Sequence, residues 1–309
     1  ARNKVQPDPV LPVLADAAGR IGFTENQLVV RSGTALLYGE PASVSGGTRP
    51  DGTVLLAIQG NASIAALRRE LDEPLLDHLS GATAWKGTIA VPRQGGLEVH
   101  VDSGLQGIAS SLPEPFNKSP AAAMPLRADY LAGGSTAGDS FRLAIGPSFQ
   151  MQTARRREGG RWSPLRGGMA LDEPLRMADK GVLLAATADR LDVDAWRRAL
   201  SGGGAGNGGS GAGGGLPISG VALKAGELRM FGQRLNDVNL RAVMEEGGWQ
   251  ARLASREATG ELTWRDQGRG RLQARFRQLA ISGGTSGSGS EAGRSADRLS
   301  ELDRKSTRL

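Results

Sequence analysis

The stretch Val238–Phe276, which reads VNLRAVMEEGGWQARLASREATGELTWRDQGRGRLQARF, decides the fold. Trp249, Ala251 and Leu253 occupy every second position in part of it, and the residues between them are polar. Because successive side chains of a β-strand point to opposite faces, this alternation places one set on each face. The stretch therefore predicts antiparallel strands with one apolar face and one face rich in arginine.

Turn signals separate these strands. Gly247-Gly248 precedes Trp249–Ser255, and Asp266-Gln267-Gly268 precedes Arg271–Phe276. Glycine pairs and Asp/Gly segments between alternating runs are typical of β-hairpins. We therefore expect a row of hairpins in this part of the chain.

The N-terminal two thirds show the same alternation in shorter runs. We interpret glycine pairs such as Gly46-Gly47 as turns between strands. The fold prediction is mainly β, with a long antiparallel sheet and few long helices. The candidate strands are Gln27–Tyr38, Thr53–Gln59, Gly87–Val91, Leu97–Val101, Leu126–Leu131, Phe141–Ile145, Ser148–Thr153 and Gly181–Ala188.

Two short helices are expected to interrupt the sheet. Ser63 is the expected cap of Ile64–Leu71, and the leucine spacing continues across a proline to about residue 79. The second helix is expected over residues 193–200, with Asp192 or Asp194 as its cap. The two segments resemble each other, because each follows a strand and each ends in an Arg-Arg pair and a leucine.

A second internal likeness pairs two strands that each end in an aromatic residue followed by glycine. Tyr38-Gly39 ends one of them, and Phe231-Gly232 ends the other. The spacings of the two likenesses differ, so the chain is not a strict repeat. They indicate hairpin units that are reused along one sheet.

Composition excludes several classes of protein. The 309 residues include no Cys and two His, so disulfides, thiolate metal sites and cysteine nucleophiles are ruled out. No apolar run approaches the roughly 20 residues of a membrane-spanning helix. Hydrophobic residues make up 39% and aromatic residues 4%, and the 46 glycines favour strands and turns. The glycine-rich segment Ser201–Gly215 is expected to be a linker or loop insertion.

No arrangement of residues predicts catalysis. His78 and His100 are expected to be surface or packing residues, and Asp172-Glu173 is expected to form a turn. The chain has no Gly-x-Ser-x-Gly elbow, and the glycine-rich segment has no Gly-Lys-Ser/Thr sequence after it. We therefore predict no enzyme activity, no cofactor and no metal site.

Arginines cluster at two places, around Arg155–Arg157 and in the last hairpin from Arg265 to Arg277. A solvated strand face is the simpler interpretation, because charge keeps sheet edges apart. Binding to nucleic acid or acidic lipid headgroups is the alternative. The chain lacks a recognition helix and interleaved aromatic residues, so we predict no nucleic-acid partner.

Several motifs together resemble the AsmA-like YhdP family of Gram-negative bacteria. The first is Leu71-x-x-Pro74 followed by Leu79-Ser-Gly81 and Trp85-x-Gly87. The second runs from Leu105 through Leu-Pro-Glu-Pro-Phe116-Asn-Lys118 to Met124-Pro125-Leu126, and Leu191-Asp-Val-Asp194-Ala-Trp196 follows. Leu228-x-x-Phe231-Gly232 and Gly248-Trp249 come next, so the markers fall in family order over about residues 19–281.

The resemblance implies an internal segment of a longer periplasmic protein that is anchored in the inner membrane outside this segment. It implies a curled, groove-like sheet whose apolar interior carries phospholipid acyl chains between the inner and outer membranes. The membranes are expected to contact the two ends of the full-length protein. Residues 1–200 would form a groove segment with helices at about 63–79 and 193–200. Residues 201–215 would be a loop insertion, and 216–282 would continue the hairpins.

The tail 283–309 is expected to be disordered. Its last seven residues, Asp303–Leu309, read DRKSTRL and resemble a translated sequencing adapter. We expect the native sequence to differ after about residue 301.

The groove prediction places a set of apolar residues of the last strands on the lipid-facing side. The same pattern also fits the core of a closed β-sandwich. Two other functions remain open: a scaffold that assembles outer-membrane proteins through its sheet edges, and a polysaccharide-handling β enzyme. The groove candidates are Val238, Leu240, Trp249, Ala251, Leu253, Leu262, Trp264, Leu272, Ala274 and Phe276.

Overall fold

The computed structural model describes most of the chain as one unit. It describes residues 3–4, 6, 12–25, 27–94, 96–133, 138–158, 161–162, 165–200, 217–245, 248–265 and 271–280. The chain divides into a unit Ala1–Leu279, which contains all the described strands, and a unit Ala280–Leu309. The glycine-rich segment 201–215, Gly247, the turn at 266–268 and the tail 283–309 lie outside the described residues.

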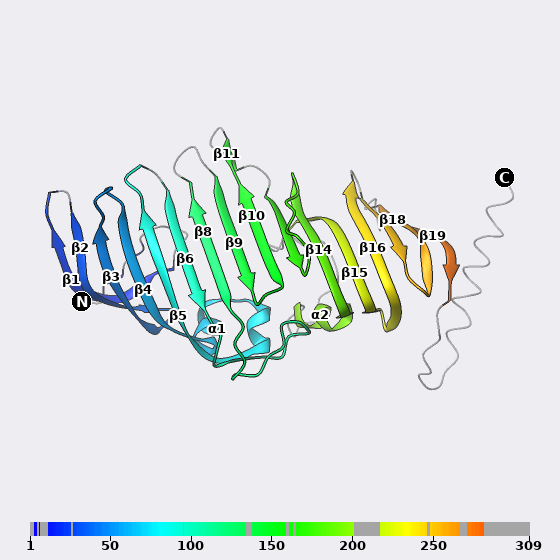
Figure 1. Cartoon of the computed structure of the whole chain (residues 1–309), viewed down its shortest axis with the longest axis horizontal. Coiled ribbons are helices and arrows are strands. Elements are labelled where there is room, and N and C mark those ends of the chain that lie inside the picture. Colours follow the sequence, from blue (N-terminus) through cyan, green and yellow to red (C-terminus); the bar gives the residue numbers. More distant parts are fainter. Residues whose placement is uncertain are drawn as a thin grey trace. The chain divides into compact units, whose positions relative to one another are not determined.

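Strands account for most of the described residues (Figure 1). The short elements are helix α1 (Ile64–Glu70), the 3₁₀-helix η1 (Pro74–His78) and helix α2 (Val193–Leu200). The first ten strands are β1 (Leu14–Phe23), β2 (Leu28–Leu37), β3 (Glu40–Thr48), β4 (Val54–Ser63), β5 (Leu79–Val91), β6 (Leu97–Ser103), β7 (Ile108–Ser110), β8 (Leu126–Ala132), β9 (Asp139–Ile145) and β10 (Phe149–Arg155). The others are β11 (Arg157–Glu158), β12 (Arg161–Trp162), β13 (Arg166–Leu171), β14 (Gly181–Asp192), β15 (Ile218–Met230), β16 (Gln233–Glu245), β17 (Gly248–Ala254), β18 (Ala258–Arg265) and β19 (Arg271–Leu279).

Seventeen of the described strands form one sheet, and β11 and β12 form a separate two-stranded ribbon. The neighbours follow chain order, from β1 through β6, then β8, β9, β10 and β13, to β19, while β7 pairs with β5. Among the described residues, β1 pairs only with β2 and β19 only with β18, so the sheet is open. The mainly β fold with two short α-helices is therefore confirmed.

The sheet is mixed, whereas the sequence predicts an antiparallel one. Strand β14 runs parallel to both β13 and β15, and every other pairing in the sheet is antiparallel. A parallel pair needs a crossover connection. Residues 172–180 provide it between β13 and β14, and α2 begins the one between β14 and β15. Alternation reports which face a residue occupies and carries no information on strand direction, so the sequence could not show this.

The register aligns apolar residues in a row across the sheet. Residues that lie directly opposite each other on neighbouring strands share a face. The central row contains only apolar residues and glycine in sixteen successive strands. It runs Gly19, Gly33, Val44, Ile58, Gly87, Val101, Ala128, Leu143, Met151, Met169, Leu184, Val221, Ala242, Ala251, Leu262 and Ala274.

A second apolar row lies one step nearer the end where α1 and α2 follow their strands. It includes Ala42, Gly60, Trp85, Ser103, Leu126, Ile145, Phe149, Leu171, Ala186, Leu223, Leu240, Leu253, Gly260 and Phe276. A third row on the other side includes Leu56, Ile89, Val99, Tyr130, Phe141, Thr153, Gly167 and Val182. We call the surface formed by these rows the apolar face.

The apolar face is buried although the described strands form a single layer. Seventeen of the described strands belong to one sheet and the other two form a short ribbon, so the described part of the chain has no second large sheet to pack on this face (Figure 1). Ala42, Ile58 and Val182 are nevertheless only 5%, 8% and 0% exposed. This burial indicates that the sheet curls toward its apolar face, as a groove does, and it does not fit the alternative of a two-sheet sandwich.

The helices occupy a place where the middle strands stop short. Ser103, the last residue of β6, lies opposite Trp85, so six residues of β5 extend beyond it. Leu171, the last residue of β13, lies opposite Ala186, so six residues of β14 also extend beyond it. Between these two longer strands lie α1, η1, α2 and the segment 104–125 (Figure 1).

An aromatic contact joins this segment to the sheet. The Phe116 ring meets Phe149 of β10 and Trp196 of α2 edge to face, with centroid distances of 5.3 and 5.7 Å. The Lys118 ammonium donates to the carbonyls of Leu105, at 2.8 Å, and Ile108. These contacts explain physically why the Leu-Pro-Glu-Pro-Phe-Asn-Lys motif carries an aromatic residue and a lysine two positions apart.

The second sequence likeness corresponds to two hairpins of the same type. Tyr38-Gly39 connects β2 to β3, and Phe231-Gly232 connects β15 to β16, with all four residues at positive φ. Two central residues at positive φ form the type I′ turn, whose twist matches that of the flanking strands. Asp194 of α2 holds the second turn, because its carboxylate accepts from the backbone N–H groups of Phe231 at 3.1 Å and Gly232 at 2.8 Å.

Other local predictions need correction. Gly46-Gly47 does not form a turn; it lies within β3 and pairs with Leu55 and Leu56 of β4, so glycine here serves close backbone packing. Ser63 occupies the N-cap position of α1 but makes no capping hydrogen bond with its side chain. Asp192 does cap α2, because its carboxylate accepts from the N–H of Ala195 at 2.7 Å.

The crossover 172–180 covers part of the opposite face, which we call the polar face because it carries the charged residues of the middle strands. Glu173 accepts hydrogen bonds from the Thr187 hydroxyl at 2.6 Å and the Lys224 ammonium at 3.1 Å. A Cβ at Gly168 would lie 2.0 Å from the carbonyl oxygen of Arg176, so only glycine fits beneath the crossover. The sequence predicts a turn at Asp172-Glu173. In the structure these two residues begin the longer crossover connection 172–180.

The centre of the polar face carries a histidine between two carboxylates. The His100 Nδ1 lies 2.5 Å from Asp129, and its Nε2 lies 2.6 Å from Asp102. Only the doubly protonated ring can donate to both partners. The hydrogen bonds to Asp129 and then Asp102 therefore raise the pKa of His100 above its ordinary value.

The two hydrogen bonds of His100 predict that the free energy of unfolding depends on pH. Because the pKa is raised in the folded state, the stabilisation is complete below the unfolded pKa of about 6.5 and is lost as pH rises through the folded value. Urea unfolding of the wild type should therefore show a loss of stability above about pH 6.5 that His100→Gln lacks. His78→Gln is the matched control and should retain the dependence. Identical profiles for the wild type and His100→Gln would contradict this assignment.

Candidate functional site: the apolar face of the sheet

The structure places all ten groove candidates on the apolar face. Ala251, Leu262 and Ala274 belong to the central row. Leu240, Leu253 and Phe276 belong to the second row. Trp249, Trp264 and Leu272 lie opposite one another at the third-row level, and Val238 lies one step beyond Leu240. Their shared face follows from the register; their role as lipid contacts stays a prediction.

Burial of these candidates falls from β16 toward β19. Val238 is 3% exposed and belongs to the main core cluster with Leu223, Ala225 and Leu228. Leu240, Leu253 and Leu262 are half-buried. At the edge, Trp264 is 40%, Phe276 40% and Leu272 58% exposed. The apolar face is therefore uncovered toward this edge of the described sheet.

The face extends well beyond the candidates that the sequence singles out. The central row continues through β15, β14 and the N-terminal strands as far as Gly19, and it includes Ile58, Val101 and Leu143. Val101 lies between two polar residues, whereas Ile58 and Leu143 each have one polar neighbour and one alanine, so the sequence carries only part of the signal. Which strands are neighbours, and in which register, is needed to show that they form one surface.

The face is suited to apolar contacts and to little else. The central row contains no polar side chain, and the polar groups of the rows beside it are the hydroxyls of Ser103, Tyr130 and Thr153 and the indole N–H groups of tryptophans such as Trp85. The Ser103 hydroxyl donates to the carbonyl of Ala84 at 2.8 Å, so the backbone satisfies it. Such a surface can gain free energy by burying alkyl chains, and it offers few directional contacts that would select one chain over another.

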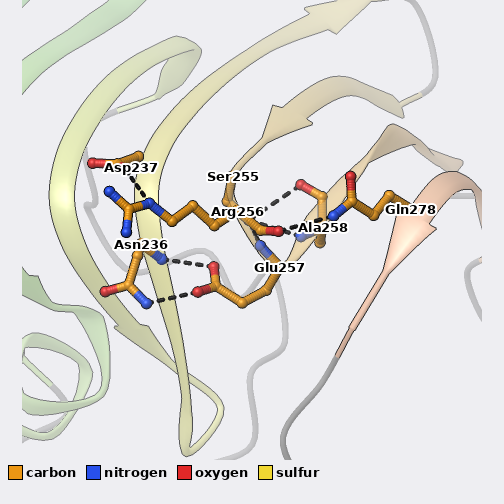
Figure 2. Close-up of polar contacts among 7 residues, drawn as sticks. All are labelled: Asn236, Asp237, Ser255, Arg256, Glu257, Ala258 and Gln278. Carbon is orange, nitrogen blue, oxygen red and sulfur yellow. Dashed lines mark hydrogen bonds and ion pairs between the residues drawn. The ribbon is translucent and has the colours of Figure 1, made fainter.

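A polar latch holds the strands where the apolar face ends at β16–β19. Figure 2 shows the Glu257 carboxylate accepting from the backbone N–H of Asn236 at 2.7 Å and from its side-chain amide at 2.6 Å. Arg256 pairs with Asp237, and its carbonyl accepts from the side chain of Gln278 at 3.0 Å. The turn between β17 and β18 is thereby bound to both β16 and β19.

The latch shifts the pKa of its carboxylate. The backbone N–H of Asn236, and then its side-chain amide, stabilise the ionised form and hold the pKa of Glu257 below its ordinary value. The ionised Glu257 therefore stabilises the folded state at pH values above the pKa of this side chain in the unfolded chain. This contribution is lost as pH falls through its pKa in the folded state.

The described residues show no metal-binding cluster. They hold no group of three or more potential metal ligands placed to share an ion. The carboxylates of Glu173, Asp192 and Asp194 hold the crossover, the α2 cap and a hairpin turn. Among the residues placed by the structure, no helix has the length and apolar character needed to cross a membrane.

Comparison with known proteins identifies the family. The model of the family described as YhdP protein matches residues 1–306. The chain belongs to the YhdP family. Comparisons with curated proteins and with solved structures found no match.

Membership of the YhdP family confirms the resemblance read from the motifs, and it fits a lipid-transport-related, AsmA-like protein. The match covers the Phe116–Lys118 motif and α2, which the aromatic contacts join, as well as the hairpins of the C-terminal strands.

The latch can be tested through Glu257→Gln. A neutral side chain accepts more weakly, so amide hydrogen exchange at Asn236 should become about fivefold faster at neutral pH. The difference from the wild type should shrink as pH falls below about 4.3. Glu98→Gln, on β6 and outside the latch, is the matched control and should leave exchange at Asn236 unchanged. Equal exchange in all three proteins would refute the latch.

Proposed function

We propose that this YhdP-family chain carries phospholipid acyl chains along its apolar face, as a segment of a periplasmic protein that moves lipid between the inner and outer membranes. The observation that carries the proposal is the central row, in which sixteen neighbouring strands present only apolar residues or glycine in one register. Family membership supports a lipid-related role.

The extent of the row fits a path for lipid better than a single binding pocket. Neighbouring strands lie about 4.8 Å apart, so the sixteen strands give a row of about 70 Å. A pocket for one ligand would be closed by polar or bulky residues at its ends. No charged residue interrupts the central row, so an alkyl chain meets similar apolar surroundings at each step.

A lipid path also needs space beside the apolar face and protection of that face from water. The single layer of strands provides the space, and the curl of the sheet provides the protection. A face packed against a second sheet would have no space for lipid, and a flat exposed apolar face would favour aggregation. The burial of Ile58 and Val182 in a single large sheet supports shielding of the face by the curl. The exposed Trp264 and Leu272 leave the face accessible at the β19 edge.

A charge placed in the central row tests the proposal. Ala274 lies in that row on β19, is exposed, and is adjacent to Gln273 on the opposite face. Ala274→Asp should lower binding of a fluorescent phospholipid to the purified chain by about tenfold, because a bound alkyl chain would desolvate the carboxylate. Gln273→Asp adds the same charge to the polar face and should bind within twofold of the wild type.

Stability measurements separate lipid binding from folding. Both side chains are exposed, so the two variants should unfold at temperatures close to that of the wild type. Unchanged lipid binding by Ala274→Asp, or an equal loss in both variants, would contradict transport along the apolar face.

A further inference from the structure

Charges on the polar face follow two different rules in two parts of the sheet. In the middle strands, charged residues that lie directly opposite each other carry opposite charges, which stabilises a sheet. These pairs are Lys86–Asp102, Asp102–Arg127, Asp129–Arg142 and, at the rim, Asp139–Arg155. The charges there satisfy one another within the sheet.

The C-terminal strands follow this rule at Glu261, which lies opposite Arg252 and Arg275, but they break it at two other places. Arg241 lies directly opposite Arg252, and Arg265 lies directly opposite Arg271. Like charges at opposed positions destabilise a strand pair. Two such unfavourable arginine pairs within four strands indicate that these arginines serve a purpose other than stabilising the sheet.

A third arginine pair shows how such repulsion can be relieved internally. Arg229 and Arg234 also lie opposite each other, and Glu227 lies 2.9 Å from the first and 3.8 Å from the second. Arg241 and Arg252 have no carboxylate placed between them in this way. Arg252 pairs instead with Glu261 on its other side, at 3.3 Å.

Arg241 and Arg252 line a concavity on the polar face together with Arg275 and Arg277. A β-bulge in β19 contributes to this arrangement. The register shifts between Thr259 and Gly260, which leaves Arg277 as an extra residue of β19. The bulge brings Arg277 into the lining beside Arg275.

The concavity carries an excess of positive charge. Glu261 is the one carboxylate among the described lining residues, against four guanidinium groups. Arg241, Arg275 and Arg277 form no ion pair with any residue that the structure describes. Thr259 and Asn239 add neutral hydrogen-bonding groups to the lining. Guanidinium groups bind phosphate oxygens through paired N–H donors, so this set matches a phosphate-bearing ligand.

We propose that the concavity lined by Arg241, Arg252, Arg275 and Arg277 binds the phosphate headgroup of an anionic lipid. Its volume of about 740 Å³ exceeds that of one phosphate ion and accommodates a headgroup. Its arginines span β16 to β19, a distance of about 14 Å, which suits phosphates presented side by side at a lipid surface. Its arginines belong to the face opposite the apolar rows, although Leu253 and Phe276 of the second row also border it, so the proposal does not depend on lipid transport along those rows.

Vesicle binding by the purified chain tests this site. The probes are vesicles of phosphatidylglycerol and phosphatidylcholine in equal parts, and vesicles of phosphatidylcholine alone. The wild type should bind the first and not the second, and salt should weaken the binding. Arg241→Gln combined with Arg275→Gln should weaken binding by at least about tenfold, because each arginine near an anionic surface contributes appreciably.

A matched double variant controls for net charge. Arg20→Gln combined with Arg93→Gln removes the same charge from exposed positions outside the concavity and should bind within twofold of the wild type. Removing Arg241 also relieves its repulsion with Arg252, so the site variant should melt at or above the wild-type temperature. Loss of binding together with unchanged or raised stability supports a binding site.

Three results would overturn the proposal. The first is no binding of the wild type to phosphatidylglycerol vesicles, and the second is an equal loss in both double variants. The third is stabilisation of the wild type, but not of the site variant, by inorganic phosphate without any vesicle binding, which would assign the site to free phosphate. Binding of a fluorescent zwitterionic phospholipid to the apolar face should be unchanged in the site variant, so the two proposals fail separately.

Discussion

A slip of one residue between any two neighbouring strands would turn every later apolar side chain to the opposite face. The apolar face therefore depends on cross-strand register being kept at each of fifteen successive junctions of the central row. Type I′ turns at Tyr38-Gly39 and Phe231-Gly232 set the register of two hairpins, because a two-residue turn allows only one alignment of the strands that it connects. The Glu257 latch serves the same purpose at the junctions of β16, β17 and β18.

The parallel junctions are the places where register is hardest to keep, because no tight turn connects the strands. Here the contacts lie outside the ladder. The crossover 172–180 is held by Glu173, which binds both β14 and β15 through Thr187 and Lys224. Helix α2 is capped by Asp192 and is bound through Asp194 to the turn between β15 and β16. These three carboxylates thus help to maintain the order of the sheet at its parallel junctions.

Alternation in the sequence was sufficient to predict the strands of the C-terminal part and the shared face of Trp249, Ala251 and Leu253, and their pairing confirms it. Strand β3 was missed because Gly46 and Gly47, inside it, look like a turn, and the parallel junctions were missed because alternation is blind to direction. The full apolar face could not be predicted residue by residue, since register depends on bulges and crossovers that leave little trace in local sequence. The arginine clusters were visible, whereas the opposition of Arg241 and Arg252 required the register.

The two faces of the sheet differ in the chemistry of their side chains. One face is apolar through its central row, and the other carries charges that pair within the middle strands but are in positive excess near β19. Photocrosslinking of lipid in cells tests the central claim, that the apolar face is a lipid path, most directly. Probes at Ile89 and Leu143, which lie far from the arginine-lined concavity, should form lipid adducts, and probes at Thr88 and Arg142 on the opposite face of the same strands should not. Lipid adducts at all four positions, or at none, would contradict it.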